Sequence, residues 1–138
     1  MSTFEYLDIE DVMGMIRVLG IGPVRDVGLL DSAVNRPQSS AFGEDAYQTI
    51  ELKSAALLHS LTKNHALVDG NKRIAWLCTV VFCDLNDYAS NLTDDEAFDL
   101  VREIASSHME VATITNRLRI AVITTDRLDQ EPMDSDQE

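Results

Sequence analysis

The sequence has few cysteines and no long hydrophobic run. Its 138 residues include only Cys78 and Cys83, five positions apart. On a helix this spacing turns the two side chains to different sides, so they cannot pair, and we expect buried thiols in a reducing cytosol. No apolar stretch approaches the roughly 20 residues that span a bilayer, and the first residues lack the basic and apolar segments of a secretory signal. These absences predict a cytoplasmic protein with no membrane contact.

Positive charge is also scarce. Lys and Arg total 11 against 24 Asp and Glu, which gives a formal net charge of −13. The phosphates of a nucleic acid would be repelled by such a surface, so we expect no direct nucleic-acid binding. A local pair of cations such as Lys72 and Arg73 can nevertheless hold a single phosphate group.

What the chain does contain is a series of helical patterns. Asp8 and Thr93 stand where N-caps are expected, and Gly20 and Pro37 where helices stop. The segment 71–85 has hardly any polar face, which is typical of a helix at the centre of a fold. We therefore predict an all-α bundle of about six helices around that central buried helix. The predicted helices cover about residues 9–19, 27–36, 46–64, 71–85, 94–108 and 111–120.

The chain is long enough for one domain that buries about two-thirds of its unfolded surface. We assign this domain to residues 1–125. Residues 126–138 carry six acidic side chains against the single Arg127. Such a composition predicts an acidic, disordered tail.

The loop at residues 37–45 shows no apolar periodicity. Its residues are mostly small and polar, which predicts an irregular loop or a small hairpin. Phe42 is its one large apolar residue. Two interpretations are open: an anchor that packs the loop against the body, or a contact for a substrate.

The nine residues from His65 to Arg73 gather most of the chemically useful groups of the chain. Histidine exchanges protons near neutral pH, and the carboxylate of Asp69 suits Mg²⁺, which binds through one or two carboxylates plus substrate phosphates. Gly70 allows a ligand to approach the backbone closely. Residues 71–73 form the first turn of the predicted central helix, where free backbone N–H groups favour an anion. Together these are the components of a phosphoryl-transfer site.

A purely structural interpretation is also open. Asp69 followed by Gly70 and Asn71 is an ordinary helix start, with Asp69 as the N-cap and His65 closing the helix before it. Two adjacent cations in a first helical turn, however, oppose the helix dipole by roughly 0.3–1 kcal/mol each. This placement favours an anion as the natural occupant of the site.

The stretch from His65 to Arg73 resembles the signature of the Fic/Doc family, His-x-Phe-x-Asp-Gly-Asn-(Gly/Lys)-Arg. Lys72 after the asparagine is similar to the Doc (death on curing) toxin branch. Residues 28–37 and 53–58 also look like Doc sequences. The resemblance covers roughly residues 5–120.

The resemblance implies a helical fold and a toxin of a toxin–antitoxin system. Members of the Fic branch transfer AMP to a protein hydroxyl, whereas Doc toxins transfer the γ-phosphate of ATP to a threonine of elongation factor Tu and so inhibit translation. The resemblance further implies ATP and Mg²⁺ as cofactors. It also implies a Phd-like antitoxin whose C-terminal segment folds into a groove over the active site.

Each residue of the motif receives a role from the resemblance. His65 would deprotonate the target hydroxyl, Asp69 would hold Mg²⁺ and Arg73 would neutralise charge. The nucleotide phosphates would be lined by Gly70, Asn71, Lys72 and Arg73. The loop at residues 37–45 matches a flap that aligns the target by strand addition, for which the contact residues would be Ser39, Ser40, Ala41 and Phe42.

The chain departs from the family pattern at two places. Ala66 and Leu67 stand where the family has Pro-Phe, so the buried anchor of the loop loses the volume of an aromatic ring. Trp76 stands where Fic enzymes have a second arginine. The absence of this arginine is expected for a Doc protein and argues against AMP transfer. The alternatives to a kinase are AMP transfer and a catalytically silent helical module that binds an antitoxin or a nucleotide.

Overall fold

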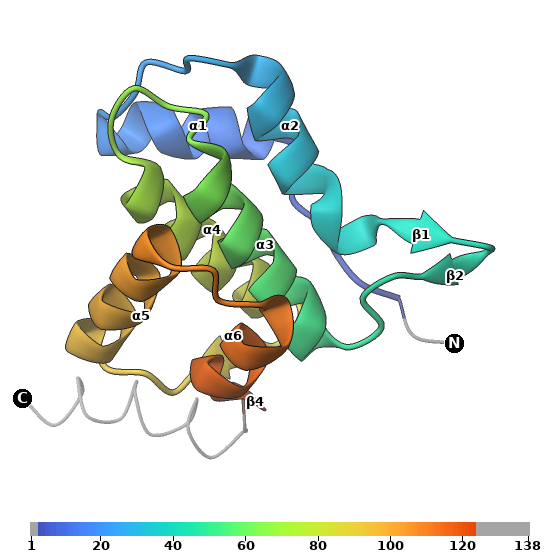
Figure 1. Cartoon of the computed structure of the whole chain (residues 1–138). Coiled ribbons are helices and arrows are strands. Elements are labelled where there is room, and N and C mark those ends of the chain that lie inside the picture. The colour runs from blue at the N-terminus through green and yellow to red at the C-terminus, as the bar shows by residue number, and fades with distance from the viewer. Residues whose placement is uncertain (1–2, 124–138) are drawn as a thin grey trace, which may run out of the picture.

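The computed structural model describes residues 3–123, which form six α-helices, one 3-10 turn and four short strands (Figure 1). The helical elements are α1 (Ile9–Leu19), α2 (Val27–Asn35), η1 (Arg36–Gln38), α3 (Ile50–Asn64), α4 (Asn71–Leu85), α5 (Asp94–Ser106) and α6 (Val111–Leu118). The strands are β1 (Ser40–Ala41), β2 (Glu44–Asp45), β3 (Tyr88–Ser90) and β4 (Ile120–Val122). This architecture confirms the predicted all-α bundle. The predicted acidic tail lies outside the described residues.

None of the helices within residues 3–123 has the length and apolar character required to span a bilayer.

Capping chemistry sets the helix starts that the sequence predicts. The Asp8 carboxylate accepts a hydrogen bond from the N–H of Asp11 at 2.8 Å, and the Asp11 carboxylate accepts one from the N–H of Asp8 at 3.0 Å. Thr93 and Glu96 form the same reciprocal pair at the start of α5. Each pair satisfies two backbone donors that the first turn leaves free, so α1 and α5 begin where predicted.

The predicted start of the third helix is wrong by four residues. α3 begins at Ile50, after Thr49, whose hydroxyl accepts a hydrogen bond from the N–H of Leu52 at 3.1 Å. The residues assigned to its first turn instead close the β1–β2 hairpin, where the N–H of Ala46 donates to the carbonyl of Ser39 at 2.9 Å. The threonine cap therefore determines where α3 begins, and the apolar spacing of the residues before Thr49 does not extend the helix.

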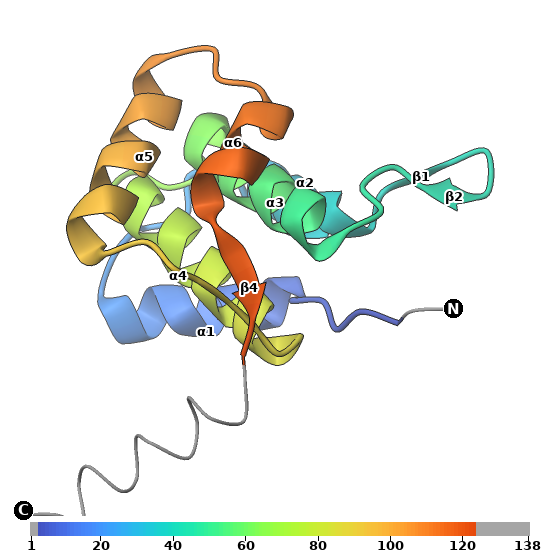
Figure 2. The ribbon, with the colours of Figure 1, turned by 90° about the horizontal axis from the view of Figure 1, so that it is seen from below.

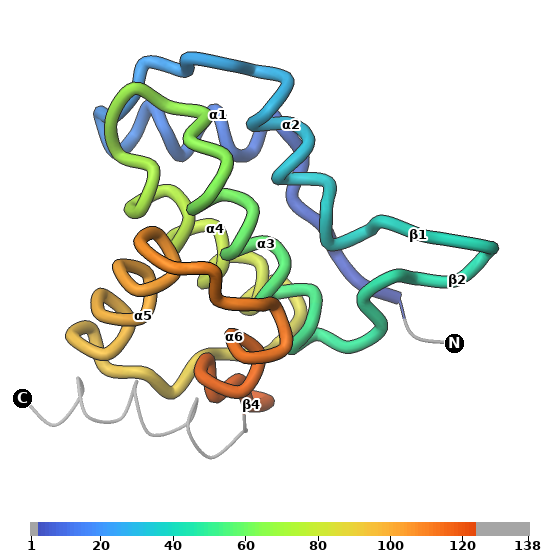
Figure 3. Tube along the Cα trace, viewed as in Figure 1, coloured from blue at the N-terminus to red at the C-terminus, as the bar shows by residue number. Residues whose placement is uncertain are grey.

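The central helix of the bundle is α3, so the prediction that residues 71–85 occupy that place is wrong. No residue of α3 is exposed, and it packs against α2, η1, α4, α5 and α6 (Figures 1 and 3). In α4, by contrast, Val80 is 42% exposed. The hydrophobic pattern of the sequence does not identify α3 as the central helix, because α3 also buries polar side chains, several of which have partners inside the protein. Ser60 accepts a hydrogen bond from Arg36 at 2.8 Å, and Ser54 lies 3.3 Å from the sulfur of Cys83.

The four strands form two separate antiparallel pairs. β1 and β2 make a small hairpin that projects from the body between α2 and α3 (Figures 1 and 2). Phe42 at its tip is fully exposed, so the interpretation of Phe42 as an anchor is wrong. β3 and β4 pair Tyr88 with Val122. The sequence does not reveal this second pair, because three-residue strands are too short to show alternation.

Both cysteines are buried free thiols, as predicted. Burial raises the pKa of Cys78 to about 12 and that of Cys83 to about 11. A thiol needs its deprotonated form to act as a nucleophile or metal ligand. These two side chains therefore serve packing.

Candidate active site

The loop that connects α3 to α4 is held by backbone pairing with the segment that precedes α2. The N–H of Gly22 donates to the carbonyl of Asp69 at 3.0 Å, and the N–H of Val68 donates to the carbonyl of Pro23 at 2.9 Å. The N–H of Arg25 donates to the carbonyl of Ala66 at 2.7 Å. The loop therefore has the support of a short antiparallel strand pair, although it carries no regular strand of its own.

His65 ends α3 in a left-handed conformation with φ of 51°. This conformation reverses the chain direction and leaves the imidazole exposed. The Arg25 guanidinium donates to the carbonyl of His65. Nothing in the sequence identified Arg25 as a support for this position, because its partner is a backbone atom 40 residues away.

Leu67 and Asn71 fix the middle of the loop. Leu67 is 2% exposed and belongs to the hydrophobic core. The Asn71 side chain accepts a hydrogen bond from the N–H of Leu67 at 3.0 Å and donates one to the carbonyl of Leu67 at 2.9 Å. The Asn71 amide is thus occupied by the loop, and the part of Asn71 that remains for a ligand is its backbone N–H.

Gly70 is the N-cap of α4, with φ of 96°. A Cβ atom at this position would lie 2.6 Å from the Cβ of Ile21. Glycine is therefore required by the packing of the motif against the segment after α1 as well as by its own backbone conformation. The close approach to Ile21 is a structural reason for this glycine that the sequence analysis did not contain.

The first turn of α4 has no side-chain cap and no acidic residue. The first hydrogen bond within the helix runs from the N–H of Ile74 to the carbonyl of Gly70, at 3.0 Å. The preceding N–H groups of residues 71–73 therefore lack helical acceptors, as at any uncapped helix start. Such a helix end favours a negatively charged ligand.

Lys72 and Arg73 add two exposed cations to this helix end. Within residues 3–123 neither of them forms an ion pair, because the three pairs of that region involve other residues. Two cations without carboxylate partners beside the positive end of a helix raise the free energy of the folded protein unless an anion is bound. This is the electrostatic observation on which the assignment of the site rests.

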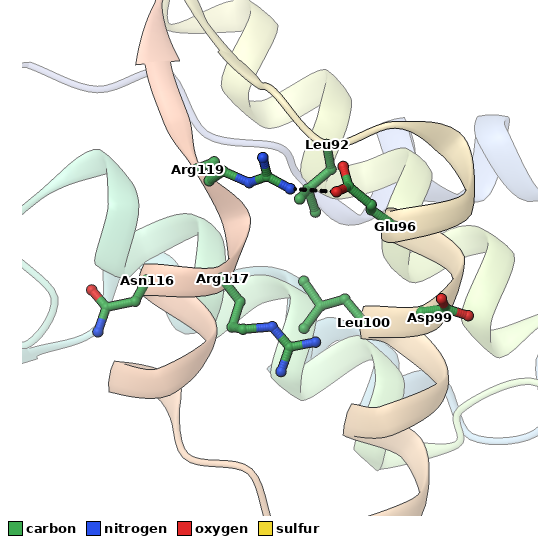
Figure 4. A pocket seen from close by; sticks show the side chains of 7 residues that line it. All are labelled: Leu92, Glu96, Asp99, Leu100, Asn116, Arg117 and Arg119. Atoms are coloured by element: carbon green, nitrogen blue, oxygen red, sulfur yellow. Dashed lines mark ion pairs between the residues drawn. The ribbon is translucent and has the colours of Figure 1, made fainter.

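The arginines of another pocket provide a contrast (Figure 4). This pocket, of about 330 Å³, lies between α5 and the α6–β4 segment. Arg119 contacts Glu96 at 2.8 Å, as the dashed line in Figure 4 marks. Arg117 contacts Glu103 at 2.8 Å. The hydrogen bond from the backbone N–H of Thr93 and, after it, the contact with Arg119 hold the pKa of Glu96 below its usual value. Both arginines of this pocket are neutralised, so it does not require an added anion.

The motif residues line a pocket of about 340 Å³ at the junction of α3, α4 and α5. It adjoins a larger hollow of about 660 Å³ against α5, and the two share His65, Lys72 and Ala105. The structure thus brings the predicted base, carboxylate and cations to one cavity. The pocket is lined by Thr62, His65, Val68, Asp69, Gly70, Asn71, Lys72, Arg73 and Ala105.

Thr62 is a member of the pocket lining that the sequence analysis missed. Its residue is 1% exposed, and within the described residues its hydroxyl has no hydrogen-bond partner. The hydroxyl of Thr79, also within a helix, donates to the carbonyl of Ala75 at 2.8 Å. An unpartnered buried hydroxyl costs about 1–3 kcal/mol. No pattern in the sequence distinguishes these two threonines.

The residues predicted to contact a target lie elsewhere. Ser39, Ser40, Ala41 and Phe42 belong to the hairpin and the turn before it, close to the N-terminal half of α3. His65 caps the opposite end of that helix (Figure 1). At 1.5 Å per residue, the helix from Lys53 to His65 spans about 18 Å. The hairpin is therefore separate from the pocket.

Comparison with known proteins identifies the family of this chain. Residues 4–83, which include the motif, match the Fic/DOC family model. A relative from Mycolicibacterium smegmatis, Toxin Doc, is 48% identical over 118 residues, covering 83% of this chain and 91% of the relative. The chain belongs to the Fic/DOC family.

Within the Fic/DOC family, the substitution of Phe by Leu67 is the departure that most concerns the site. The structure shows that Leu67 is still buried and that its backbone is held by both Asn71 and the bridge to Val24. These hydrogen bonds do not depend on the volume of the side chain. The loop of this Fic/DOC protein therefore keeps its support despite the smaller anchor.

The donor set fits a Mg²⁺ ion that is shared with phosphates. No group of three or more His, Cys, Asp or Glu side chains capable of holding a metal occurs in residues 3–123. Asp69 is an exposed single carboxylate in the pocket. Mg²⁺ is usually bound by one or two carboxylates, water and substrate phosphates, so a lone carboxylate is a sufficient protein contribution.

The contact between Gly70 and Ile21 yields a stability prediction. In Gly70→Ala the new methyl group meets Ile21 in a backbone conformation that disfavours side chains, so we expect a loss of about 2–4 kcal/mol of unfolding free energy. Urea denaturation measures it. Gly20→Ala is the matched control, because Gly20 also has positive φ, 67°, and no atom lies within 4 Å of its added Cβ. Equal losses in the two variants would contradict the account of the contact.

Proposed function

We propose that this protein is the toxin of a toxin–antitoxin system and acts as a protein kinase. It transfers the γ-phosphate of ATP to a threonine of elongation factor Tu and thereby inhibits translation. The observation that supports this proposal most strongly is the uncapped start of α4, where Lys72 and Arg73 have no carboxylate partner beside His65 and Asp69. The name of the relative, Toxin Doc, supports the toxin role.

Each residue has a definite task in this reaction. His65 accepts the proton of the threonine hydroxyl while that oxygen forms a bond to the γ-phosphorus. The bond from the γ-phosphorus to the β–γ bridging oxygen breaks, and ADP leaves with that electron pair. The N–H groups of residues 71–73, Lys72 and Arg73 bind the phosphate oxygens. Asp69 would hold Mg²⁺, which supplies neutralisation of phosphate charge when it is bound.

Two residues support transfer of the γ-phosphate of ATP over transfer of AMP. Lys72 takes the place of the glycine that Fic enzymes have after the asparagine, and its side chain lines the pocket. Trp76 replaces the second arginine of the Fic pattern and lines a neighbouring apolar groove. One cationic residue of the AMP-transfer site is therefore replaced by an apolar one, while a new cation is added at the helix start.

Incubation with elongation factor Tu, Mg²⁺ and labelled ATP tests the reaction. We expect γ-label and no α-label on the target, because the transferred group is the terminal phosphate. In His65→Ala the rate should fall about 10²–10⁴-fold, since loss of a positioned base has that cost. Transfer of α-label would identify AMP transfer. Absence of both labels, with growth unaffected by expression, would support a silent binding module.

The antitoxin proposal rests on an apolar groove of about 590 Å³ between α4 and α5. Exposed Val80 and Phe98 lie in it, and Lys72 and Arg73 lie at one end, so the groove is continuous with the candidate active site. An amphipathic helix can place its apolar face in such a groove. An acidic segment of a Phd-like antitoxin that binds there would cover the two cations and block the nucleotide.

Val80→Glu tests this groove. A carboxylate there should weaken binding of the Phd-like antitoxin by tenfold or more, because burial of an unpaired charge is costly. Val18→Glu is the control, since Val18 is 87% exposed on α1 and outside the groove. Both variants should remain toxic alone, and only Val80→Glu should resist co-expressed antitoxin. Full neutralisation of Val80→Glu would exclude the groove.

A further inference from the structure

Among the described residues, Lys53 has the largest side chain that is completely buried, and this side chain ends in an ammonium group. It lies in the first half of α3 with 0% exposure. Its ammonium group donates to the carbonyl of Pro37 at 3.1 Å and to the carboxylate of Asp45 at 3.1 Å. A buried ammonium group is costly unless it is paired and hydrogen-bonded, so these two contacts are needed to keep Lys53 inside.

The two partners of Lys53 are the two ends of the hairpin. Pro37 lies in η1, from which the chain enters the hairpin, and Asp45 is the last residue of β2. Lys53 therefore joins the segment before the hairpin and the end of β2 to the same point of the central helix. Motion of the hairpin base relative to α3 would separate the ammonium group from one of its acceptors.

The N-terminal segment covers Lys53 from another side. The ammonium group lies 4.8 Å from the ring centre of Phe4 and 5.4 Å from that of Tyr6. Tyr6 in turn stacks on Phe82 of α4, with ring centres 6.0 Å apart. Aromatic faces stabilise a cation where water is excluded. This segment and the hairpin leave the body on the same side (Figure 3).

The hairpin has little other support. Every residue from 38 to 46 is exposed, and β1 and β2 share only the pairs Ser40–Asp45 and Ala41–Glu44. A two-stranded hairpin of this size is marginally stable in water. Its second attachment is at the base, where Arg36 donates to the Tyr47 hydroxyl at 2.9 Å. The direction in which the hairpin projects therefore depends on contacts at its base.

We propose that Lys53 is a positioning residue for the target protein. It holds the hairpin in one orientation, so that the free strand edges and Phe42 are presented as a preformed docking edge. The anchor point of this edge, Lys53, lies about 18 Å along α3 from His65. The proposal rests on the proposed function in that the docked protein is the phosphate acceptor, elongation factor Tu. A preformed edge avoids the entropic cost of ordering the backbone on binding.

Backbone ¹⁵N relaxation of the full chain in a His65→Ala background tests the structural half. In Lys53→Met we expect order parameters at residues 40–45 to fall from about 0.85 to below about 0.6, whereas those of the six helices stay unchanged. Methionine fills the same buried space, and Asp45 is 48% exposed and can be solvated. Asp45→Asn should give a smaller change in the hairpin, since the bond to Pro37 remains.

Lys63→Met is the matched control. Lys63 is also a lysine of α3 that donates to backbone carbonyls, at 2.7 Å to Ser107, but it does not touch the hairpin. Its replacement should leave the order parameters of residues 40–45 unchanged. Rigid hairpins in both Lys53→Met and Asp45→Asn would overturn the role of Lys53, as would equal loosening in Lys63→Met.

The affinity for elongation factor Tu tests the functional half without depending on phosphate transfer. Relative to His65→Ala alone, His65→Ala with Lys53→Met should bind the factor with a Kd raised roughly tenfold or more, while its Kd for ATP stays unchanged. An unchanged Kd for the factor, or no binding by His65→Ala itself, would overturn the docking role. Failure of the wild-type chain to transfer phosphate is a separate result, which would reject the proposed function alone.

Discussion

The backbone pairing between residues 22–25 and the loop at 66–69 is the constraint on which the candidate site depends. It fixes the path of the chain between the two longest helices through three hydrogen bonds of 2.7–3.0 Å. Because the loop is held by backbone atoms, the side chains of His65, Asp69 and Val68 remain exposed for a ligand. Gly70 completes this arrangement, since only a residue without Cβ allows Ile21 to approach.

The same central helix connects the candidate site with the hairpin that we propose as the docking edge. The C-terminal end of α3 delivers His65 to the pocket, and its N-terminal half holds the hairpin through Lys53. A rigid, buried helix keeps two distant regions at a constant separation, because its residues are packed on all sides. A protein that transfers a group to another protein requires such a fixed relation between the reacting atoms and the surface that docks the target.

Much of the fold could be predicted from the sequence because local chemistry encodes it. The capping pairs at Asp8 and Thr93 place two helix starts correctly, and the glycine-containing turn at Gly70 places the start of α4. The motif residues are consecutive, so their convergence on one pocket follows from local geometry.

The remaining features depend on contacts between distant residues. The burial of Lys53 could not be predicted, because a lysine is normally exposed and its partners lie 8 and 16 residues away. The centrality of α3 was missed for the same reason, and the unpartnered hydroxyl of Thr62 has no sequence signal. Phe42 was expected by one interpretation to be buried, yet a hairpin that stands clear of the body leaves it in water.

The central claim is that the uncapped start of α4 is the phosphate-binding site. It is tested most directly by ¹⁵N–¹H spectra of the His65→Ala protein titrated with ATP and Mg²⁺. We expect the largest shifts at the backbone amides of residues 71–73, and weaker shifts there when Lys72 is replaced by Met. Saturating ATP that leaves these amides unchanged, or that shifts the pocket around Arg117 and Arg119 instead, would contradict the account.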